Sequence, residues 1–224
     1  SAAIHHDMTT VFFSLEMGRT ELAMRVLSAE GRISMGRLKK GDLDQEGWTN
    51  LATLQGKITG APLFIDDSPN MTLMEIRAKC RRLKQRNQLQ LVVLDYLQLM
   101  SSGKKVESRQ QEVSEFSRSL KLLAKELEVP VIALSQLNRG SEQRTDKRPM
   151  ISDLRESGSI EQDADMVILL HREDMYNPDS DRVGEADMII AKHRGGPTKT
   201  IPLAFSGKYS RFNNMASETP PQQY

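Results

Sequence analysis

The segment from Leu89 to Met100, LQLVVLDYLQLM, constrains the fold of this chain more than any other part of it. The apolar, partly β-branched run from Leu91 to Leu94 predicts a short, fully buried strand of the kind found in parallel sheets. This strand ends in Asp95, at the edge where open α/β sheets bind their ligands. An acid at such a position can hold a metal ion, but many acids there only cap a loop. Asp95 alone therefore leaves both interpretations open.

Composition limits the class of protein. The 224 residues are enough for one large domain with a sizeable core and too few for two. Lys and Arg number 31 against 30 Asp and Glu, so any contact with nucleic acid must come from local patches. One cysteine, Cys80, and four histidines exclude an internal disulfide and a zinc cluster and indicate a reducing compartment. No apolar run could span a membrane and no signal peptide opens the chain, so we expect a cytoplasmic protein without membrane contacts.

Short apolar runs alternate with amphipathic segments along the chain. Strands are predicted near residues 9–13, 62–66, 91–94, 130–134 and 166–170. Thr72 and Glu75 form a capping-box pattern, which predicts that a helix begins there. Two further strands, 185–192 and 198–205, are joined by the tight-turn sequence RGGP at 194–197. These patterns predict an α/β domain with a mostly parallel, twisted sheet flanked by helices and with antiparallel strands at its C-terminal end.

Polar side chains follow three of the predicted strands. Glu16 comes shortly after the strand at 9–13, Asp95 ends the strand at 91–94, and Gln136 follows the strand at 130–134. Because parallel strands share a direction, their carboxyl ends lie at one edge of the sheet and these side chains could converge. Nucleotide hydrolysis uses such a set: one carboxylate holds the metal, another polarises the attacking water, and an amide senses the terminal phosphate. Three unrelated loop caps are the alternative, and their joint occurrence favours a functional site.

Five motifs in order give the chain its resemblance to a known family. They are FSLEM (13–17), LDYLQL (94–99), LSQLNR (134–139), DLRESGSIEQDAD (153–165) and AKHR (191–194). Together they resemble the motifs of bacterial replicative DNA helicases of the DnaB type, over residues 9–215. The resemblance implies a RecA-like fold of the P-loop NTPase type that works as a homo-hexameric ring. It also implies hydrolysis of ATP with Mg²⁺ at each subunit interface, movement along single-stranded DNA, and a helicase loader and primase as partners.

The resemblance implies a role for each matched residue. Glu16 corresponds to the catalytic carboxylate that activates water, and Asp95 to the metal-associated acid of the Walker B strand. Gln136 corresponds to the amide that couples the terminal phosphate to the DNA loops. Arg25, one helix after Glu16, is expected to face the phosphates as well.

Lys192 and Arg194 correspond to a pair that is donated across the subunit interface to the neighbour's nucleotide. Residues two apart on a strand point to the same face, so both cations could reach one triphosphate. An arginine delivered in trans stabilises the charge that develops in the transition state. Without the resemblance, the two residues would be interpreted as an exposed strand end.

Residues 155–158, RESG, correspond to the family's DNA-contacting loop. Arg155 would supply charge and Gly158 would allow close approach of the backbone to a phosphate, with Glu156 between them. No aromatic residue lies nearby in the sequence, so such a loop would hold phosphates more than bases. A charged surface loop without a ligand is the alternative.

One motif of the family does not occur in the 224 residues, namely the P-loop, Gly-x4-Gly-Lys-Ser/Thr. Its backbone amides and lysine hold the β- and γ-phosphates. We therefore expect residues 1–216 to be a motor domain that lacks its P-loop, followed by a disordered tail at 217–224. Such a chain would bind ATP poorly by itself and would not unwind DNA.

Two other functions remain open. One is a RecA-like recombination or repair ATPase, which the combination of the motifs at 153–165 and 191–194 argues against. The other is a non-catalytic module that joins the ring or a loader, which the missing P-loop keeps in consideration.

Overall fold

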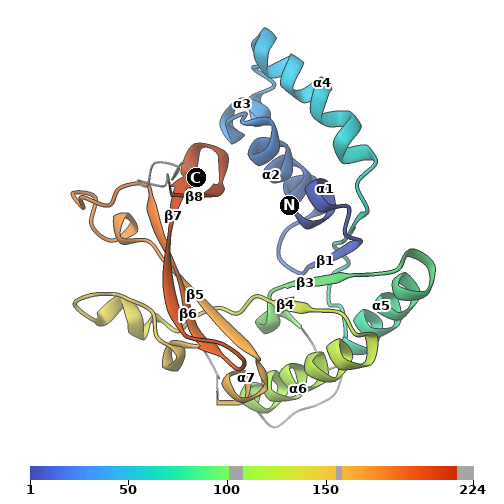
Figure 1. Ribbon diagram of the computed structural model, residues 1–224, viewed down its shortest axis with the longest axis vertical. Helices are drawn as coiled ribbons and strands as arrows, with labels where there is room; N and C mark the ends of the chain where they lie inside the picture. Colours follow the sequence, from blue (N-terminus) through green and yellow to red (C-terminus); the bar gives the residue numbers. More distant parts are fainter. Residues whose placement is uncertain (101–107, 155–157, 216–224) are drawn as a thin grey trace, which may run out of the picture.

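Two sheets form the framework of the chain in the computed structural model, which describes residues 1–100, 108–154 and 158–215 (Figure 1). The first sheet is parallel, in the order β2-β1-β3-β4, with β1 Thr10–Ser14, β2 Leu63–Asp66, β3 Leu91–Asp95 and β4 Val131–Ala133. The second is antiparallel, in the order β5-β6-β7-β8, with β5 Met166–His171, β6 Glu185–His193, β7 Lys199–Ser206 and β8 Arg211–Asn214. The predicted α/β architecture with antiparallel C-terminal strands is confirmed.

Helices connect the parallel strands: α2 Arg19–Gly31, α3 Met35–Lys40 and α4 Gln45–Thr59 lie between β1 and β2, α5 Leu73–Asn87 between β2 and β3, and α6 Arg109–Leu127 between β3 and β4. The helix α1 Ala2–His6 precedes β1, and α7 Gly158–Asp163 lies between the two sheets in the sequence. Short 3-10 turns are η1 Leu97–Leu99, η2 Arg139–Gln143, η3 Ile151–Asp153, η4 Glu173–Met175 and η5 Gly207–Tyr209. No helix in the described part of the chain has the length and apolar character that crossing a membrane requires. The tail predicted at 217–224 lies outside the described residues.

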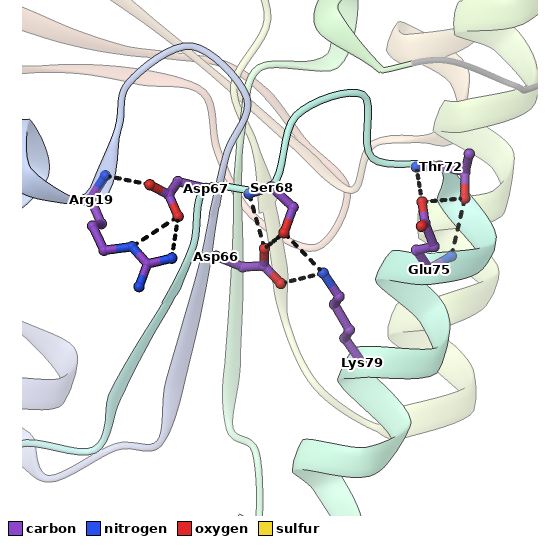
Figure 2. A network of polar contacts seen from close by, with 7 residues as sticks. All are labelled: Arg19, Asp66, Asp67, Ser68, Thr72, Glu75 and Lys79. Atoms are coloured by element: carbon purple, nitrogen blue, oxygen red, sulfur yellow. Dashed lines mark hydrogen bonds and ion pairs between the residues drawn. The ribbon is translucent and has the colours of Figure 1, made fainter.

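The predicted capping box starts α5. The Thr72 side-chain oxygen accepts from the Glu75 backbone N–H at 3.3 Å, and the Glu75 carboxylate accepts from the Thr72 N–H at 2.7 Å (Figure 2). Each residue thus satisfies a backbone donor that the first helical turn leaves free. The helix prediction from these two residues is confirmed.

Strand β3 is buried on one face only, so the prediction of a fully buried strand is wrong. Val92 and Leu94 share a hydrophobic core with residues of α5 and α6, such as Ile76 and Phe116. The intervening residue Val93 lies on the opposite face, in register with Phe12 of β1 and Ile132 of β4. That face is incompletely covered by the described residues, and Ile132 is 53% exposed. An apolar run cannot reveal how many helices will cover each face of its sheet.

The two sheets share this core without sharing a ladder. Val167 and Leu169 of β5 belong to the same hydrophobic cluster as Leu94 of β3. In the described residues β4 and β5 are nevertheless edge strands of separate sheets. The outward side chains of both are exposed large hydrophobics, including Ile132, Leu134, Ile168 and Leu170.

The segment after β4 is fastened at both ends. Leu137 forms an isolated antiparallel bridge with Leu154, and the Asn138 N–H donates to the Asp153 carbonyl at 2.7 Å. The buried Asp153 carboxylate accepts from the Arg144 guanidinium at 2.8 Å. These contacts hold residue 154, the last described before 155–157, beside the strand end that carries Gln136.

A second buried carboxylate ties this segment to the antiparallel sheet. Asp187 of β6 is 4% exposed and accepts from Arg148 at 2.9 Å and from Arg182 at 2.7 Å. The Arg148 guanidinium also donates to the Thr200 hydroxyl of β7 at 3.0 Å. Two cations therefore compensate one buried anion, as burial of a carboxylate requires.

Replacement of Asp187 by Asn should destabilise the chain. The hydrogen bond from Arg182 holds the pKa of this carboxyl below its usual range, with Arg148 adding to the effect. A depressed folded-state pKa stabilises the fold above the unfolded-state value, and this stabilisation is lost as the pH falls through the folded-state value. We expect Asp187→Asn to lower the free energy of unfolding by about 2–4 kcal/mol near pH 7 and by less near pH 4.

Denaturant unfolding at the two pH values tests this. Asp181→Asn is the control, because Asp181 is exposed and lies shortly before β6 in the sequence. An equal loss at both pH values, or an equal loss in the control, would contradict the role assigned to Asp187.

Candidate functional site

The pairing of β1 with β3 brings the two predicted carboxylates to one edge of the sheet. Ser14, the last residue of β1, lies in register with Asp95, and the Leu15 N–H donates to the Asp95 carbonyl at 2.8 Å. The Ser14 hydroxyl donates to the Met17 carbonyl at 2.6 Å, which folds the chain back directly after the strand. Glu16 lies within this turn, close enough for its charge to act on Asp95.

Burial raises the pKa of the Asp95 carboxyl, and the negative charge of Glu16 raises it further. The positive charge of Arg25 acts in the opposite direction and lowers that pKa. Two carboxylates that repel each other in a partly desolvated position disfavour the charged form of Asp95. A bound cation would relieve this repulsion.

Asp95, with the charge of Glu16 nearby, fits Mg²⁺ as one carboxylate of a coordination shell that other ligands complete. No group of three or more His, Cys, Asp and Glu side chains that could hold a metal ion occurs within the described ranges. Two carboxylates do not make a dedicated metal cage, but Mg²⁺ commonly takes one or two carboxylates together with waters and substrate phosphates. The donor set at this edge therefore fits a magnesium ion that arrives with a nucleotide.

Arg25 lies one helical turn from its own partner on α2. Its guanidinium donates to Glu21 at 2.9 Å in an i,i+4 pair, and both side chains are partly exposed. Such a surface pair contributes little stability and opposes movement of the arginine only weakly. Arg25 can therefore turn toward an anion near Asp95.

Asp67, which follows β2, holds the start of α2. The N-cap of α2 is Gly18, which has no side chain to accept a hydrogen bond. Asp67 takes that role from another element, because it accepts from the Arg19 N–H at 2.9 Å and from the Arg19 side chain at 3.1 Å (Figure 2). These contacts fix the helix that follows the Glu16 turn. The sequence shows an acid here but not its distant partner.

Gln136 lies at the same edge of the sheet. The Leu134 N–H donates to the Leu94 carbonyl at 2.9 Å, and the Leu97 N–H donates to the Leu134 carbonyl at 3.0 Å. These two bonds extend the contact between β3 and β4 beyond their last paired residues. Gln136 is exposed two residues further on. The structure thus places Glu16, Asp95 and Gln136 at the ends of the neighbouring strands β1, β3 and β4.

Lys192 and Arg194 are engaged elsewhere. The Lys192 ammonium contacts the Glu161 carbonyl and donates to the Gln162 carbonyl at 3.4 Å, so it caps the C-terminal end of α7. The Arg194 N–H donates to the Asp165 carbonyl at 2.8 Å, and its guanidinium lies 3.5 Å from the Asp165 carboxylate. The partners of both cations belong to α7 and to the segment before β5. They do not include Glu16, Asp95 or Gln136.

Arg194 lies in the turn that the sequence RGGP predicted, so the argument that Lys192 and Arg194 share one face of a strand does not apply to it. Strand β6 ends at His193, and Arg194 is the first residue of the turn that leads to β7. Its side chain is 77% exposed. The turn gives the guanidinium more freedom than a strand position would, so it can reach a partner outside its own chain.

Of the predicted DNA loop, only Gly158 can be placed. It is the exposed first residue of α7, and a Cβ atom added there would meet no atom of the described residues within 4 Å. On the side of the described residues the backbone at this position is open to an approaching group. Arg155 and Glu156 lie outside the described residues.

Comparison with known proteins decides the family. Residues 1–214 match the DnaB-like helicase C terminal domain. The chain belongs to the DnaB-like helicase C-terminal domain family. The "Replicative DNA helicase DnaB" of Leifsonia xyli subsp. xyli is 69% identical over 216 residues, which cover 96% of this chain and 47% of that protein. The chain thus spans about half the length of the curated relatives that it matches.

Two solved structures share the fold of this DnaB-like domain. One, described as an ATPase domain, superposes with a TM-score of 0.90 at 42% identity, over 94% of this chain and 76% of that one. "The Structure Of A DnaB-Like Replicative Helicase And Its Interactions With Primase" gives the same TM-score and identity over 94% of this chain and 51% of that one. Family membership favours the helicase over the recombination or repair ATPase considered from the sequence.

Replacement of Asp95 by Asn should stabilise this DnaB-like domain while removing a site residue. Because the folded-state pKa of Asp95 lies above its usual value, ionisation costs stability. This cost is absent below the unfolded-state pKa and grows as the pH rises through the folded-state value. We expect Asp95→Asn to raise the melting temperature by about 1–3 °C near pH 7 and by less near pH 4.

Thermal unfolding of the two chains at both pH values provides the measurement. A variant that melts below the parent near pH 7 would show that the Asp95 charge is compensated in the fold, and would contradict this electrostatic account.

Proposed function

We propose that residues 1–216 form most of the ATP-driven motor domain of a replicative DNA helicase. The motor moves along single-stranded DNA and unwinds the duplex at the replication fork, in the cytoplasm. One observation carries this proposal: Glu16 and Asp95 are electrostatically coupled at the carboxyl edge of a parallel sheet, with Arg25 beside them and Gln136 on the next strand end. Nucleotide hydrolysis needs this combination of acid, base and phosphate sensor.

Each side chain at this edge has a chemical task in the proposal. The Asp95 carboxylate would hold Mg²⁺, and Glu16 would accept a proton from the attacking water. The Gln136 amide donates a hydrogen bond to the terminal phosphate, and the Arg25 guanidinium compensates its negative charge. When bound, Mg²⁺ neutralises charge on the β- and γ-phosphates.

The nucleotide needs a P-loop, which the 224 residues do not contain. We propose that a P-loop segment from another part of the protein adds its strand between the edges of β4 and β5. Both edges lack a neighbour among the described strands, and both carry exposed apolar side chains although their inner faces share one core. An added strand would pair the free backbone groups and would bring the phosphates to the carboxyl edge of the sheet, next to Gln136 at the end of β4.

The ring is the second requirement of the proposal. Lys192 and Arg194 contact their own chain away from Glu16, Asp95 and Gln136, so they complete the site of a neighbouring subunit in a homo-hexamer. Single-stranded DNA passes the loop at 155–158. A helicase loader and primase are the further partners, the latter supported by the relative whose structure is described with its primase interactions.

A chimera tests the motor function. The matched 216 residues of the Leifsonia xyli helicase would be replaced by the corresponding residues of this chain, so that the P-loop and the rest of the protein are supplied. We expect DNA-stimulated ATP hydrolysis and duplex unwinding from the chimera, and neither from the 224-residue chain alone. An inactive chimera that still forms rings would favour the second candidate, a non-catalytic ring or loader module, which the missing P-loop supports.

Mixed rings test the assignment of residues to the two sides of an interface. Chimeras with Glu16→Ala and with Arg194→Ala should each be inactive. When the two are mixed, an interface can combine an intact Glu16 with an intact Arg194, and about a quarter of the parental ATPase rate should return if subunits mix at random.

The matched control mixes Glu16→Ala with Asp95→Asn. Both changes affect the same side of the interface, so no interface regains a full set and no activity should return. Recovery in the control, or none with Arg194→Ala, would show that the two sides are assigned incorrectly.

A further inference from the structure

Gln98 binds both backbone polar groups of Gln136. Its side-chain oxygen accepts from the Gln136 N–H at 3.1 Å, and its side-chain nitrogen donates to the Gln136 carbonyl at 3.4 Å. The same nitrogen donates to the Ser135 hydroxyl at 2.9 Å. One amide side chain therefore holds the residue that precedes the Leu137–Leu154 bridge.

The direction of these bonds follows from the chemistry of the groups. A backbone N–H can only donate and a backbone carbonyl can only accept, so the amide oxygen must face the first and the amide nitrogen the second. The two bonds together resemble a single β-bridge residue, made by a side chain in place of a strand. They fix the orientation of the Gln136 backbone at a point where β4 has already ended.

Gln98 is itself fixed on the other side. It lies in η1, three residues after Asp95, and its carbonyl accepts from the Arg109 guanidinium at 2.6 Å. Arg109 of α6 also donates to the Met100 carbonyl at 3.2 Å. Gln98 is thus held by a helix of the core and connects the turn after Asp95 with the backbone of Gln136.

We propose that Gln98 is a positioning residue. By holding the backbone of Gln136, it sets the direction of the Gln136 side-chain amide relative to Asp95. The inference rests on the proposed function, because it gives Gln98 an effect through the phosphate-sensing role of Gln136. It extends that function by connecting the metal side of the site to the sensor through one side chain. Gln136 is exposed, so loss of these bonds leaves its backbone less restrained on that side.

The effect should appear in kcat rather than in KM. In the chimera, Gln98→Met removes all three bonds at similar side-chain volume, and we expect a roughly 10- to 100-fold lower kcat with KM for ATP within about threefold. Ser135→Ala removes only the hydrogen bond from Gln98 to the Ser135 hydroxyl and keeps both bonds to the Gln136 backbone. This variant should leave kcat within about threefold of the parent. Gln85→Met is the control, since Gln85 is an exposed glutamine on α5.

A double-mutant cycle separates positioning from general damage. Gln136→Ala keeps the backbone groups that Gln98 binds and removes the side chain that it would position. If Gln98 acts through that side chain, Gln98→Met should cause no further loss in the Gln136→Ala background. Gln98→Glu keeps the acceptor for the Gln136 N–H and should lose less activity than Gln98→Met, which provides a second variant should the first fold poorly.

Hydrogen exchange on the 224-residue chain tests whether Gln98 restrains the Gln136 backbone, and it requires no ATPase activity. The backbone N–H of Gln136 should exchange faster in Gln98→Met than in the parent or in Gln85→Met. Three results would overturn this inference and leave the proposed function intact. They are unchanged exchange of the Gln136 backbone N–H, an unchanged kcat in an active chimera, and equal losses of kcat with and without the Gln136 side chain. A parental chimera without ATPase activity would overturn the proposed function and this inference with it.

Discussion

The pairing of β1 with β3 is the interaction on which the rest of the structure depends. Its register sets Ser14 beside Asp95, so the turn after β1 and the end of β3 meet at one edge. The bond from the Leu15 N–H to the Asp95 carbonyl continues the ladder beyond the strands. A slip by one residue would turn the side chain of Asp95 to the opposite face of the sheet and separate it from Glu16. Burial raises the pKa of Asp95, and the register adds the repulsion from Glu16.

The same arrangement separates the acids and the amide from the pair Lys192 and Arg194, which the proposal assigns to two sides of a subunit interface. The acids and the amide lie at the carboxyl edge of β1, β3 and β4, whereas Lys192 and Arg194 lie at the end of β6 beside α7. An anionic substrate at the first edge would meet Arg25 as the nearby cation of its own chain. A triphosphate needs more positive charge than one exposed arginine provides, and in the proposed function a P-loop and a neighbouring subunit supply it.

Local sequence patterns predicted much of this architecture. The apolar runs, the acid at the end of β3 and the capping box at Thr72 each depend on neighbours within a few residues, and each was found where predicted. Five motifs in order also identified the family. The separation of the two cations from the carboxyl edge was implied only by the resemblance, because their partners, on α7 for Lys192 and at Asp165 for Arg194, are distant in the chain.

The features that could not be predicted depend on contacts between distant segments. Asp67 caps a helix 48 residues away, and Gln98 binds a backbone 38 residues away. A strand prediction likewise cannot say that only one face of β3 is covered. In each case the residue type was visible in the sequence, but its partner depended on the packing of other elements.

In the proposed function, the carboxyl edge of the parallel sheet forms one half of a nucleotide site. A crystal structure of the chimera ring with a non-hydrolysable ATP analogue and Mg²⁺ would test this proposal. We expect the metal at Asp95, the terminal phosphate between Glu16 and Gln136, and Arg194 of the adjacent subunit at the same phosphate. A nucleotide bound at another edge, or Arg194 still paired with Asp165 of its own chain at every occupied site, would contradict it.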